Sequence, residues 1–414
     1  MNRVMGSGSK LWLVIARPDR LHAALLAAQA LGEQFTGGCH LIREDSVWWQ
    51  RADWQRWTHR FESVQAFPRV EACRGLIDLP RFYRETAARR AAMAELDIDS
   101  ERDVLLVLGG VLAIGNAAVS ANPRVFKILA VAKNAYEDLM RPIDRTRYRF
   151  TTSGWFQNRL VDRALGMNRT IYMKPRVNPG GDGVRLSRLE KEPTQIYDRI
   201  VISSNSGRDF PSGATEQMIP ALHPTIAELR DVAADRNPKG RRRVVFFGTP
   251  FLLIRNLEPR VYVDHLNVCL DYLRREYGAT CTLCYRPHPA ETNESAELQL
   301  GAFEVEDDRE AAELYFLRHY REIAAVFSVS STVSRIAFNN GLNAYCFWRC
   351  FPFGSTAREF FAHLMGNVPP EFEIRDLSQP PVPYVGSYQA PQGALSFSAA
   401  LQDAVARRAA HHAA

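Results

Sequence analysis

The sequence lacks any apolar run long enough to cross a bilayer. The longest, Val104–Val119, is interrupted by glycines and by Asn116, and it falls short of the roughly 20 residues that a spanning helix needs. The pattern of a signal peptide is missing too, because Met5–Lys10 is small and polar and the apolar stretch after it is short. We therefore expect a cytoplasmic protein, with peripheral attachment to the inner membrane as the alternative.

A disulfide framework is also missing. The chain has seven cysteines, an odd number without regular spacing, which favours a reducing compartment. Cys281 and Cys284 form a C-x-x-C, but they lie in a run with the composition of a strand, where positions three apart point to opposite faces. We therefore expect buried strand thiols rather than a zinc or redox site, and neither a metal nor another cofactor.

The sequence contains no basic stripe with interleaved aromatic residues, the usual footprint of a nucleic-acid-binding protein. It has 52 Lys and Arg against 46 Asp and Glu, a net charge of +6, and the positive residues are scattered. This charge pattern predicts no nucleic-acid partner. It fits an ordinary basic surface, affinity for anionic substrates, or affinity for the anionic face of a membrane.

What the sequence does contain is a repeated pattern of an apolar strand followed by a helix. With 414 residues, two domains are expected. In the first half the pattern predicts a helix at Leu21–Leu31, helices with loops between Trp48 and Glu95, and strands at Leu11–Ala16, Val104–Leu108, Val125–Val131, Ile171–Met173 and Ile200–Ser203.

A polar and basic segment, Asp235–Arg243, separates the two halves as a linker would. After it, Gly278 is expected to cap a long helix. The second half predicts strands at Val244–Phe247, Thr280–Tyr285, Phe303–Val305, Ile323–Phe327 and Leu342–Phe347, and helices at Val261–Tyr277, Glu310–Leu317, Thr332–Phe338 and Leu395–Ala409.

The predicted fold class is therefore α/β, with two Rossmann-like domains facing a central cleft. We expect the domains at residues 1–234 and 244–390, the linker at 235–243, and a C-terminal helix and tail at 391–414. Two α/β units, a linker and a late C-terminal helix match the GT-B architecture of glycosyltransferases. This is an analogy of fold, and the chemistry has to come from particular residues.

The strongest candidate site is the run Tyr285-Arg286-Pro287-His288-Pro289, which follows a predicted strand. Ligands bind outside the carboxyl ends of strands in open α/β sheets. The two prolines stiffen the loop and fix His288, whose ring can donate a proton to a phosphate leaving group. The alternative is a rigid turn with a solvated histidine, and the proline frame and the position favour the functional interpretation.

A second candidate is Phe327–Thr332, where four hydroxyl residues, Ser328, Ser330, Ser331 and Thr332, lie between a strand and a helix. Such residues cap helices, and the same geometry presents hydroxyls, free amides and the positive helix end to an anion. Four hydroxyls exceed the needs of one cap, which favours phosphate binding. A third, weaker candidate is Gly248-Thr249 after the first strand of this half, where a glycine would let the backbone approach a ligand.

These segments together carry a resemblance to a known family. Val244–Pro250 (VVFFGTP), Leu283–Pro289 (LCYRPHP), Glu310–Leu317 (EAAELYFL) and Val326–Ala337 (VFSVSSTVSRIA) occur in order. In this order and spacing they resemble bacterial CMP-sialic-acid-dependent sialyltransferases and polysialyltransferases, which carry an HP motif and a serine-pair motif in a GT-B fold. The resemblance covers Val244–Phe347 well and the first half thinly.

The resemblance implies roles for several of these residues. His288 would protonate or hydrogen-bond the departing CMP phosphate, and Ser330 and Ser331 would hold it. Arg286 stands where a lysine is common in the family, so the positive charge is kept. No metal would be required, the first domain would bind the acceptor, and the second would bind the nucleotide sugar.

The family's third motif, an acidic pair followed by glycine, supplies the base that deprotonates the acceptor. This chain departs from it. Glu137-Asp138 follows the strand predicted at Val125–Val131 but lacks the glycine, and Gly181-Asp182-Gly183 has the glycine but one acid. We expect Glu137 or Asp138 to be the base by position, with Asp182 in reserve; plain solvated surface is the alternative for both segments.

The predicted function is that of an inverting glycosyltransferase. It would move sialic acid or a related nonulosonic acid from a CMP donor to a cell-surface glycan, in association with capsule assembly. Three alternatives stay open: a CMP-Kdo-dependent transferase, a CDP-polyol phosphotransferase, and a degenerate, non-catalytic scaffold of a capsule-assembly complex.

Overall fold

The structure is a computed structural model of the whole chain. It describes residues 8–46, 54–70, 76–108, 113–122, 124–132, 197–203, 218–229, 241–249, 257–288, 297–306, 310–365, 368–383 and 393–411, together with Trp49 and Glu291.

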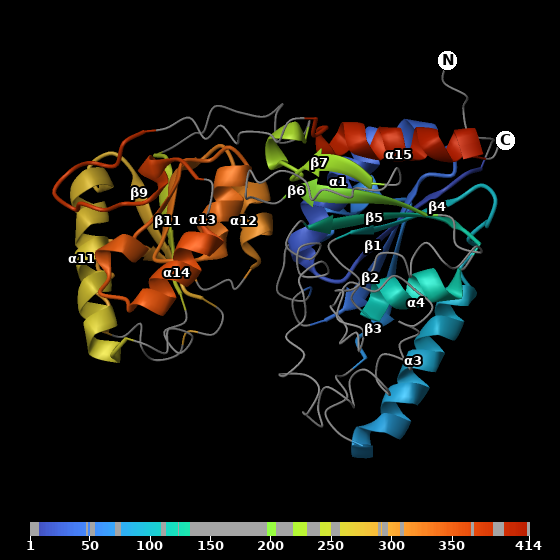
Figure 1. Ribbon diagram of the computed structural model, residues 1–414, viewed down its shortest axis with the longest axis horizontal. Coiled ribbons are helices and arrows are strands. Elements are labelled where there is room, and N and C mark those ends of the chain that lie inside the picture. Colours follow the sequence, from blue (N-terminus) through green and yellow to red (C-terminus); the bar gives the residue numbers. More distant parts are fainter. Residues whose placement is uncertain are drawn as a thin grey trace.

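The N-terminal half forms a seven-stranded sheet in which all neighbouring strands are parallel. The strand order is β3-β2-β1-β4-β5-β6-β7 (Figure 1). The strands are β1 (Leu11–Ile15), β2 (Cys39–Asp45), β3 (Ser63–Pro68), β4 (Val104–Leu108), β5 (Phe126–Ala132), β6 (Tyr197–Ser203) and β7 (Met218–Leu222).

The central strands of this sheet are covered on both faces, which explains their continuous apolar sequences. Leu11 and Leu13 of β1 belong to one hydrophobic cluster with α1 (Leu21–Leu31), whereas Trp12 and Val14 belong to the other cluster with α4 (Ala113–Ala121). A longer helix, α3 (Leu79–Ala94), packs against α4.

The C-terminal half repeats the plan with five parallel strands in the order β10-β9-β8-β11-β12. The strands are β8 (Arg243–Phe247), β9 (Thr282–Arg286), β10 (Glu304–Val305), β11 (Ile323–Ser328) and β12 (Ala344–Cys346). The helices are α11 (Pro259–Tyr277), α12 (Ala312–His319), α13 (Thr332–Asn339) and α14 (Ser355–Leu364).

The chain then returns to the first domain. Its last helix, α15 (Phe397–His411), lies against α1, β6 and β7 (Figure 1). Nε2 of Gln402 donates to the carbonyl of Ala30 at 3.2 Å, and Arg408 donates to the carbonyl of Arg102 at 2.8 Å. The C-terminal helix is therefore part of the N-terminal domain in space.

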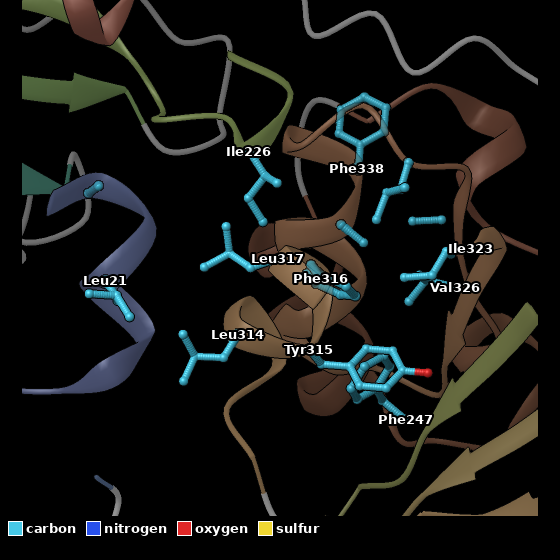
Figure 2. Packing of buried hydrophobic residues seen from close by; sticks show 14 of the residues in the cluster. Leu21, Ile226, Phe247, Leu314, Tyr315, Phe316, Leu317, Ile323, Val326 and Phe338 are labelled. Atoms are coloured by element: carbon cyan, nitrogen blue, oxygen red, sulfur yellow. The ribbon is translucent and has the colours of Figure 1, made fainter. Parts of the chain in front are cut away.

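The two domains meet through α12, which packs against α1 and against the 3-10 turn η1 (Pro18–Arg20). Leu314 and Leu317 of α12 face Leu21 of α1 and Ile226 of the segment after β7 (Figure 2). The amide of Ile226 also donates to Oδ1 of Asn340 at 2.7 Å. One continuous apolar cluster therefore joins the domains.

The predicted fold class is confirmed: two Rossmann-like α/β domains face a cleft, in the GT-B arrangement. The strands predicted around Leu11, Val104, Val125 and Ile200 are present, as are those of the second half. The expected domain boundaries at 234/235 and 390/391 and the strand expected at Ile171–Met173 lie outside the described residues.

Three strands were missed, and the burial of one cysteine differs from the expectation. β2 and β7 were not expected, and β3 lies in the stretch between Trp48 and Glu95 that was expected to hold helices and loops. Gly278 is the C-cap of α11 as expected, with a φ of −61° and its amide donating to the carbonyl of Arg274. Cys284 is buried as expected, whereas Cys281 is only partly buried because it precedes β9.

No helix among the described residues combines the length and the apolar character that a membrane crossing requires.

Candidate functional site

A cleft of about 810 Å³, including its open mouth, lies between the domains. The first domain contributes the turn after β1. The second contributes the loops after β8, β9 and β11 and the start of α12. The lining residues are Arg17, Pro18, Asp19, Phe247, Gly248, Arg286, Pro287, His288, Glu310, Ala311, Ala312, Ser331 and Val333.

The topology of the two sheets explains this position. In both sheets the chain order reverses beside the first strand, between β1 and β4 and between β8 and β11. The connections on the two sides of such a reversal go to opposite faces of the sheet, which leaves a crevice at the carboxyl ends of the strands. Here loops from both crevices line one cleft.

His288 lies at the end of β9 and lines the cleft, as the sequence predicted for a ligand-binding residue. It is half-buried, and burial lowers the pKa of its imidazole below the ordinary value of 6.5. Its carbonyl accepts from the amide of Glu291 at 2.7 Å, which closes a tight turn. Burial therefore favours the neutral form of the ring. Pro289 lies outside the described residues.

The serine loop divides into supporting and exposed hydroxyls. Ser328 is buried, shares a 2.8 Å hydrogen bond with Ser334, and accepts from the amide of Ser331 at 3.1 Å. Oγ of Ser331 accepts from the amide of Val333 at 3.2 Å and caps α13. Ser331 also lines the cleft, and its hydroxyl proton is not used in the cap.

The other two hydroxyls predicted to bind substrate lie elsewhere. Ser330 is 6% exposed and does not line the cleft, and Thr332 is exposed but does not line it either. The structure therefore brings Ser331, rather than the serine pair, to the same cleft as His288. Capping and anion binding are compatible at Ser331, because one uses an acceptor lone pair and the other the hydroxyl hydrogen.

Arg286 lies at the floor of the cleft with its guanidinium held inside the domain. Nη1 donates to Glu306 at 3.3 Å, and Nη2 donates to the carbonyl of Glu310 at 3.2 Å. The guanidinium also lies 4.0 Å from the ring centre of Tyr315, and the residue is 3% exposed. Arg286 therefore fixes the corner between β9, β10 and α12, and its charge toward a ligand is offset by Glu306.

Gly248 lines the cleft, but its glycine is explained by a neighbour within the domain. A Cβ at this position would collide with the carboxylate of Glu291. That carboxylate accepts from the hydroxyl of Tyr285 at 3.1 and 3.2 Å. The carboxylate of Glu291, rather than a ligand, is thus the group that lies close to the backbone of Gly248. The sequence analysis missed Glu291, although it stands three residues after His288. The buried hydroxyl of Thr249 has no hydrogen-bond partner among the described residues.

The first domain contributes two charged side chains that the sequence analysis also missed, Arg17 and Asp19. Both belong to the turn after β1, where the crevice of the first sheet opens. Arg17 is exposed, while Oδ1 of Asp19 is buried without a hydrogen-bond partner among the described residues. The available signal was a charged turn directly after the first buried strand.

An acidic group of the second domain faces this turn. Burial, with the negative charge of Asp19 second, raises the pKa of Glu313 to about 7. Arg20 and Arg17 act in the opposite sense but more weakly. The contact between η1 and α12 therefore contains a carboxyl group that changes charge near neutral pH.

Glu137, Asp138 and Asp182, the candidate bases, lie outside the described residues. Among the described N-terminal residues, Asp19 is the acidic side chain that lines the cleft.

Among the described residues, two acidic groups resemble metal-binding sequences or clusters, and their carboxylates make other contacts. Cys284, Glu304 and Glu306 lie close enough to share an ion, but Arg243 forms ion pairs with both glutamates and Arg286 with Glu306. The Asp97-Ile98-Asp99 sequence precedes β4 and so lies toward the amino end of that strand, whereas the cleft lies at the carboxyl ends of the strands. There Asp97 pairs with Lys10 at 2.5 Å, and Asp99 accepts from the amide of Glu101 at 2.8 Å.

No protein-family model and no curated protein matches this chain. Several solved structures are similar over most of their length. A UDP-N-acetylglucosamine 2-epimerase from Rickettsia bellii is 9% identical over 97% of this chain and 96% of its own, with a TM-score of 0.44. An α/β-galactoside α-2,3-sialyltransferase from Photobacterium phosphoreum is 9% identical over 89% and 98%, with a TM-score of 0.41. The ADP-heptose LPS heptosyltransferase II of E. coli is 7% identical over 97% and 99%, with a TM-score of 0.36. Likeness at these levels does not assign a function, which has to be argued from the site.

Proposed function

We propose that this protein is an inverting glycosyltransferase that moves a nonulosonic acid, sialic acid or a relative, from its CMP donor to a cell-surface glycan. The observation that carries the proposal is the convergence of His288 and Ser331 on one interdomain cleft. They come from the loops after β9 and β11, on either side of β8, in the domain whose motifs resemble those of sialyltransferases.

The proposed reaction is a single displacement. A carboxylate of the first domain takes the proton of the acceptor hydroxyl, with Glu137 or Asp138 as the proposed base and Asp182 in reserve. The acceptor oxygen forms a bond to the anomeric carbon as the bond from that carbon to the phosphate oxygen breaks. The electron pair leaves with CMP, and His288 and Ser331 meet the developing charge on the phosphate.

The buried environment of His288 supports this role. Burial lowers the pKa of the imidazole and so favours its neutral form before the donor binds. The negative charge of the arriving phosphate then raises the pKa of the ring and favours the imidazolium form, which can donate its proton or a hydrogen bond to the leaving phosphate.

Transfer is proposed to need no metal or other cofactor. The expected result is full activity in the presence of a chelator. Activity that a chelator abolishes and manganese restores would contradict the proposal.

Donor screening tests the function directly. Purified protein is offered CMP-sialic acid, CMP-Kdo and CDP-glycerol, and the release of CMP is followed with and without glycan acceptors. Acceptor-dependent release from CMP-sialic acid is the expected result. Release from CMP-Kdo alone would change the sugar, and release from CDP-glycerol would indicate a polyol phosphotransferase. Binding without turnover of any donor would favour a scaffold that acts in capsule assembly, attached peripherally to the membrane.

A further inference from the structure

We propose that Arg17 binds the carboxylate of the donor sugar and so makes the enzyme selective for acidic sugars. This inference rests on the proposed function, because it assumes that a CMP-sugar occupies the interdomain cleft. It concerns the wall of the cleft that the motifs of the second domain do not cover.

The first reason is that Arg17 is available to a ligand. Its side chain is exposed in the cleft and forms no hydrogen bond or ion pair with any described residue. The other arginine of the lining, Arg286, is buried and paired with Glu306. Glu310, which also lines the cleft, pairs with Arg318 at 2.6 Å. Within the described lining, Arg17 is thus the arginine that forms no ion pair.

The second reason is position. The loops that would hold the phosphate, with His288 and Ser331, belong to the second domain, whereas Arg17 belongs to the turn after β1 of the first domain. A donor held by its phosphate on one wall presents its sugar to the other. In a nonulosonic acid the carboxylate is attached to the anomeric carbon, which is also bonded to the phosphate oxygen. The carboxylate is therefore close to the phosphate subsite and able to face the first domain.

The third reason is chemistry. A guanidinium presents paired N–H groups that match the two oxygens of a carboxylate, and such charge-assisted pairs are stronger than neutral hydrogen bonds. Pro18 directly follows Arg17 and is buried, which restricts the backbone of the turn. Glu44 and Glu313 influence Arg17 only through space, without an ion pair among the described residues.

The test compares two ligands that differ by the sugar. CMP and a CMP-sialic acid analogue with fluorine at C3, which slows the departure of CMP, are titrated calorimetrically into wild type, Arg17→Gln and Arg17→Lys. Arg17→Gln is expected to lower the affinity for the analogue by about 10- to 100-fold, because hydrogen bonds to charged groups contribute about 1.5–3 kcal/mol. The affinity for CMP should change by less than about twofold. The affinity of Arg17→Lys for the analogue should lie between those of the wild type and Arg17→Gln.

Arg20→Gln is the matched control. Arg20 belongs to the same turn and carries the same charge, but it does not line the cleft and lies 4.0 Å from Asp19. It should bind both ligands as wild type does. Melting temperatures of all variants establish that they are folded.

The outcomes separate the two proposals. An equal loss for CMP and for the analogue would overturn the inference, because Arg17 would then bind the phosphate. Unchanged affinity for both ligands, or a loss of the same size in Arg20→Gln, would overturn it as well. A wild-type protein that binds neither ligand would instead contradict the proposed function itself.

Discussion

At the scale of single residues, the loop after β9 fixes the position of His288 at the cleft. Pro287 precedes it, the amide of Glu291 closes the turn on its carbonyl, and the ring lines the cleft without belonging to the core. A side chain in this position can be removed with little effect on packing. The role of the imidazole can therefore be tested separately from the stability of the fold.

We expect His288→Ala to reduce transfer by about 10²- to 10⁴-fold, the usual contribution of a general acid. Its melting temperature should stay close to that of the wild type. Steady-state kinetics with the donor found by screening, together with thermal melts, provide the measurement. A folded variant with near wild-type turnover would exclude His288 as the proton donor.

Ser331 caps a helix and is proposed to bind phosphate, and an alanine substitution would remove both functions at once. Its oxygen caps α13, so Ser331→Ala would lose about 1 kcal/mol of stability as well as any contact with phosphate. Ser331→Asp separates the two, because aspartate is a good cap but repels an anion. We expect Ser331→Asp to melt as wild type does and to bind CMP at least about tenfold more weakly. Ser330→Ala, at a position outside the lining, serves as the control for CMP affinity. Unchanged CMP binding in Ser331→Asp would reduce the loop to a helix cap.

At the scale of elements, the sequence predicts the strands whose apolar runs are continuous, because β1, β4 and β8 are buried on both faces. β2 was missed because Arg43, Glu44 and Asp45 give it a polar second half. β3 is an edge strand whose residues are largely half-exposed, so its sequence carries little of the strand pattern. Such strands are fixed by pairing with a neighbour, which a single sequence does not contain.

The candidate site shows the same limit. Motifs placed His288, Gly248 and Ser331 in one cleft because they follow neighbouring strands. They did not reveal that Arg286 pairs with Glu306 or that the carboxylate of Glu291 approaches Gly248, since these partners lie in other segments of the chain. Arg17 and Asp19 follow the first predicted strand, and only the packing of the two domains makes their turn part of the cleft.

The apolar contact between α12 and α1 is the element that joins the domains. Leu314 is 2% exposed and faces Leu21 (Figure 2). We expect Leu314→Ala to lower the free energy of unfolding by about 2–4 kcal/mol and to make denaturant unfolding less cooperative, because the domains lose part of their shared core.

Val268→Ala is the matched control, since Val268 is 54% exposed on α11. Denaturant unfolding followed by fluorescence and by circular dichroism should give coincident transitions for this control and separated ones for Leu314→Ala. Coincident transitions in both variants would mean that the contact does not couple the domains.

At the scale of the whole molecule, the two domains also meet through charges, and these change with pH. Glu313 at the start of α12 faces Asp19, Arg17 and Arg20 of the first domain, and its pKa is raised from 4.5 to about 7. The folded protein therefore holds this proton at pH values where the unfolded chain has lost it. The stabilisation is complete below about pH 4.5, decreases as pH rises, and is lost above about pH 7.

We therefore expect Glu313→Gln, which cannot ionise, to be more stable than the wild type at pH 8 and nearly equal to it at pH 5. One pKa unit corresponds to about 1.4 kcal/mol, and because the side chain is partly exposed we expect a difference of about 2 kcal/mol at pH 8. Thermal melts of both proteins between pH 5 and pH 9 provide the measurement, with the exposed Glu95→Gln as the control. A difference that stays constant over this range would show that Glu313 does not titrate in the contact. A difference that grows with pH would mean that ionisation of Glu313 against Asp19 weakens the attachment of the two domains beside the cleft, so the cleft would open more easily in alkaline solution than in acid.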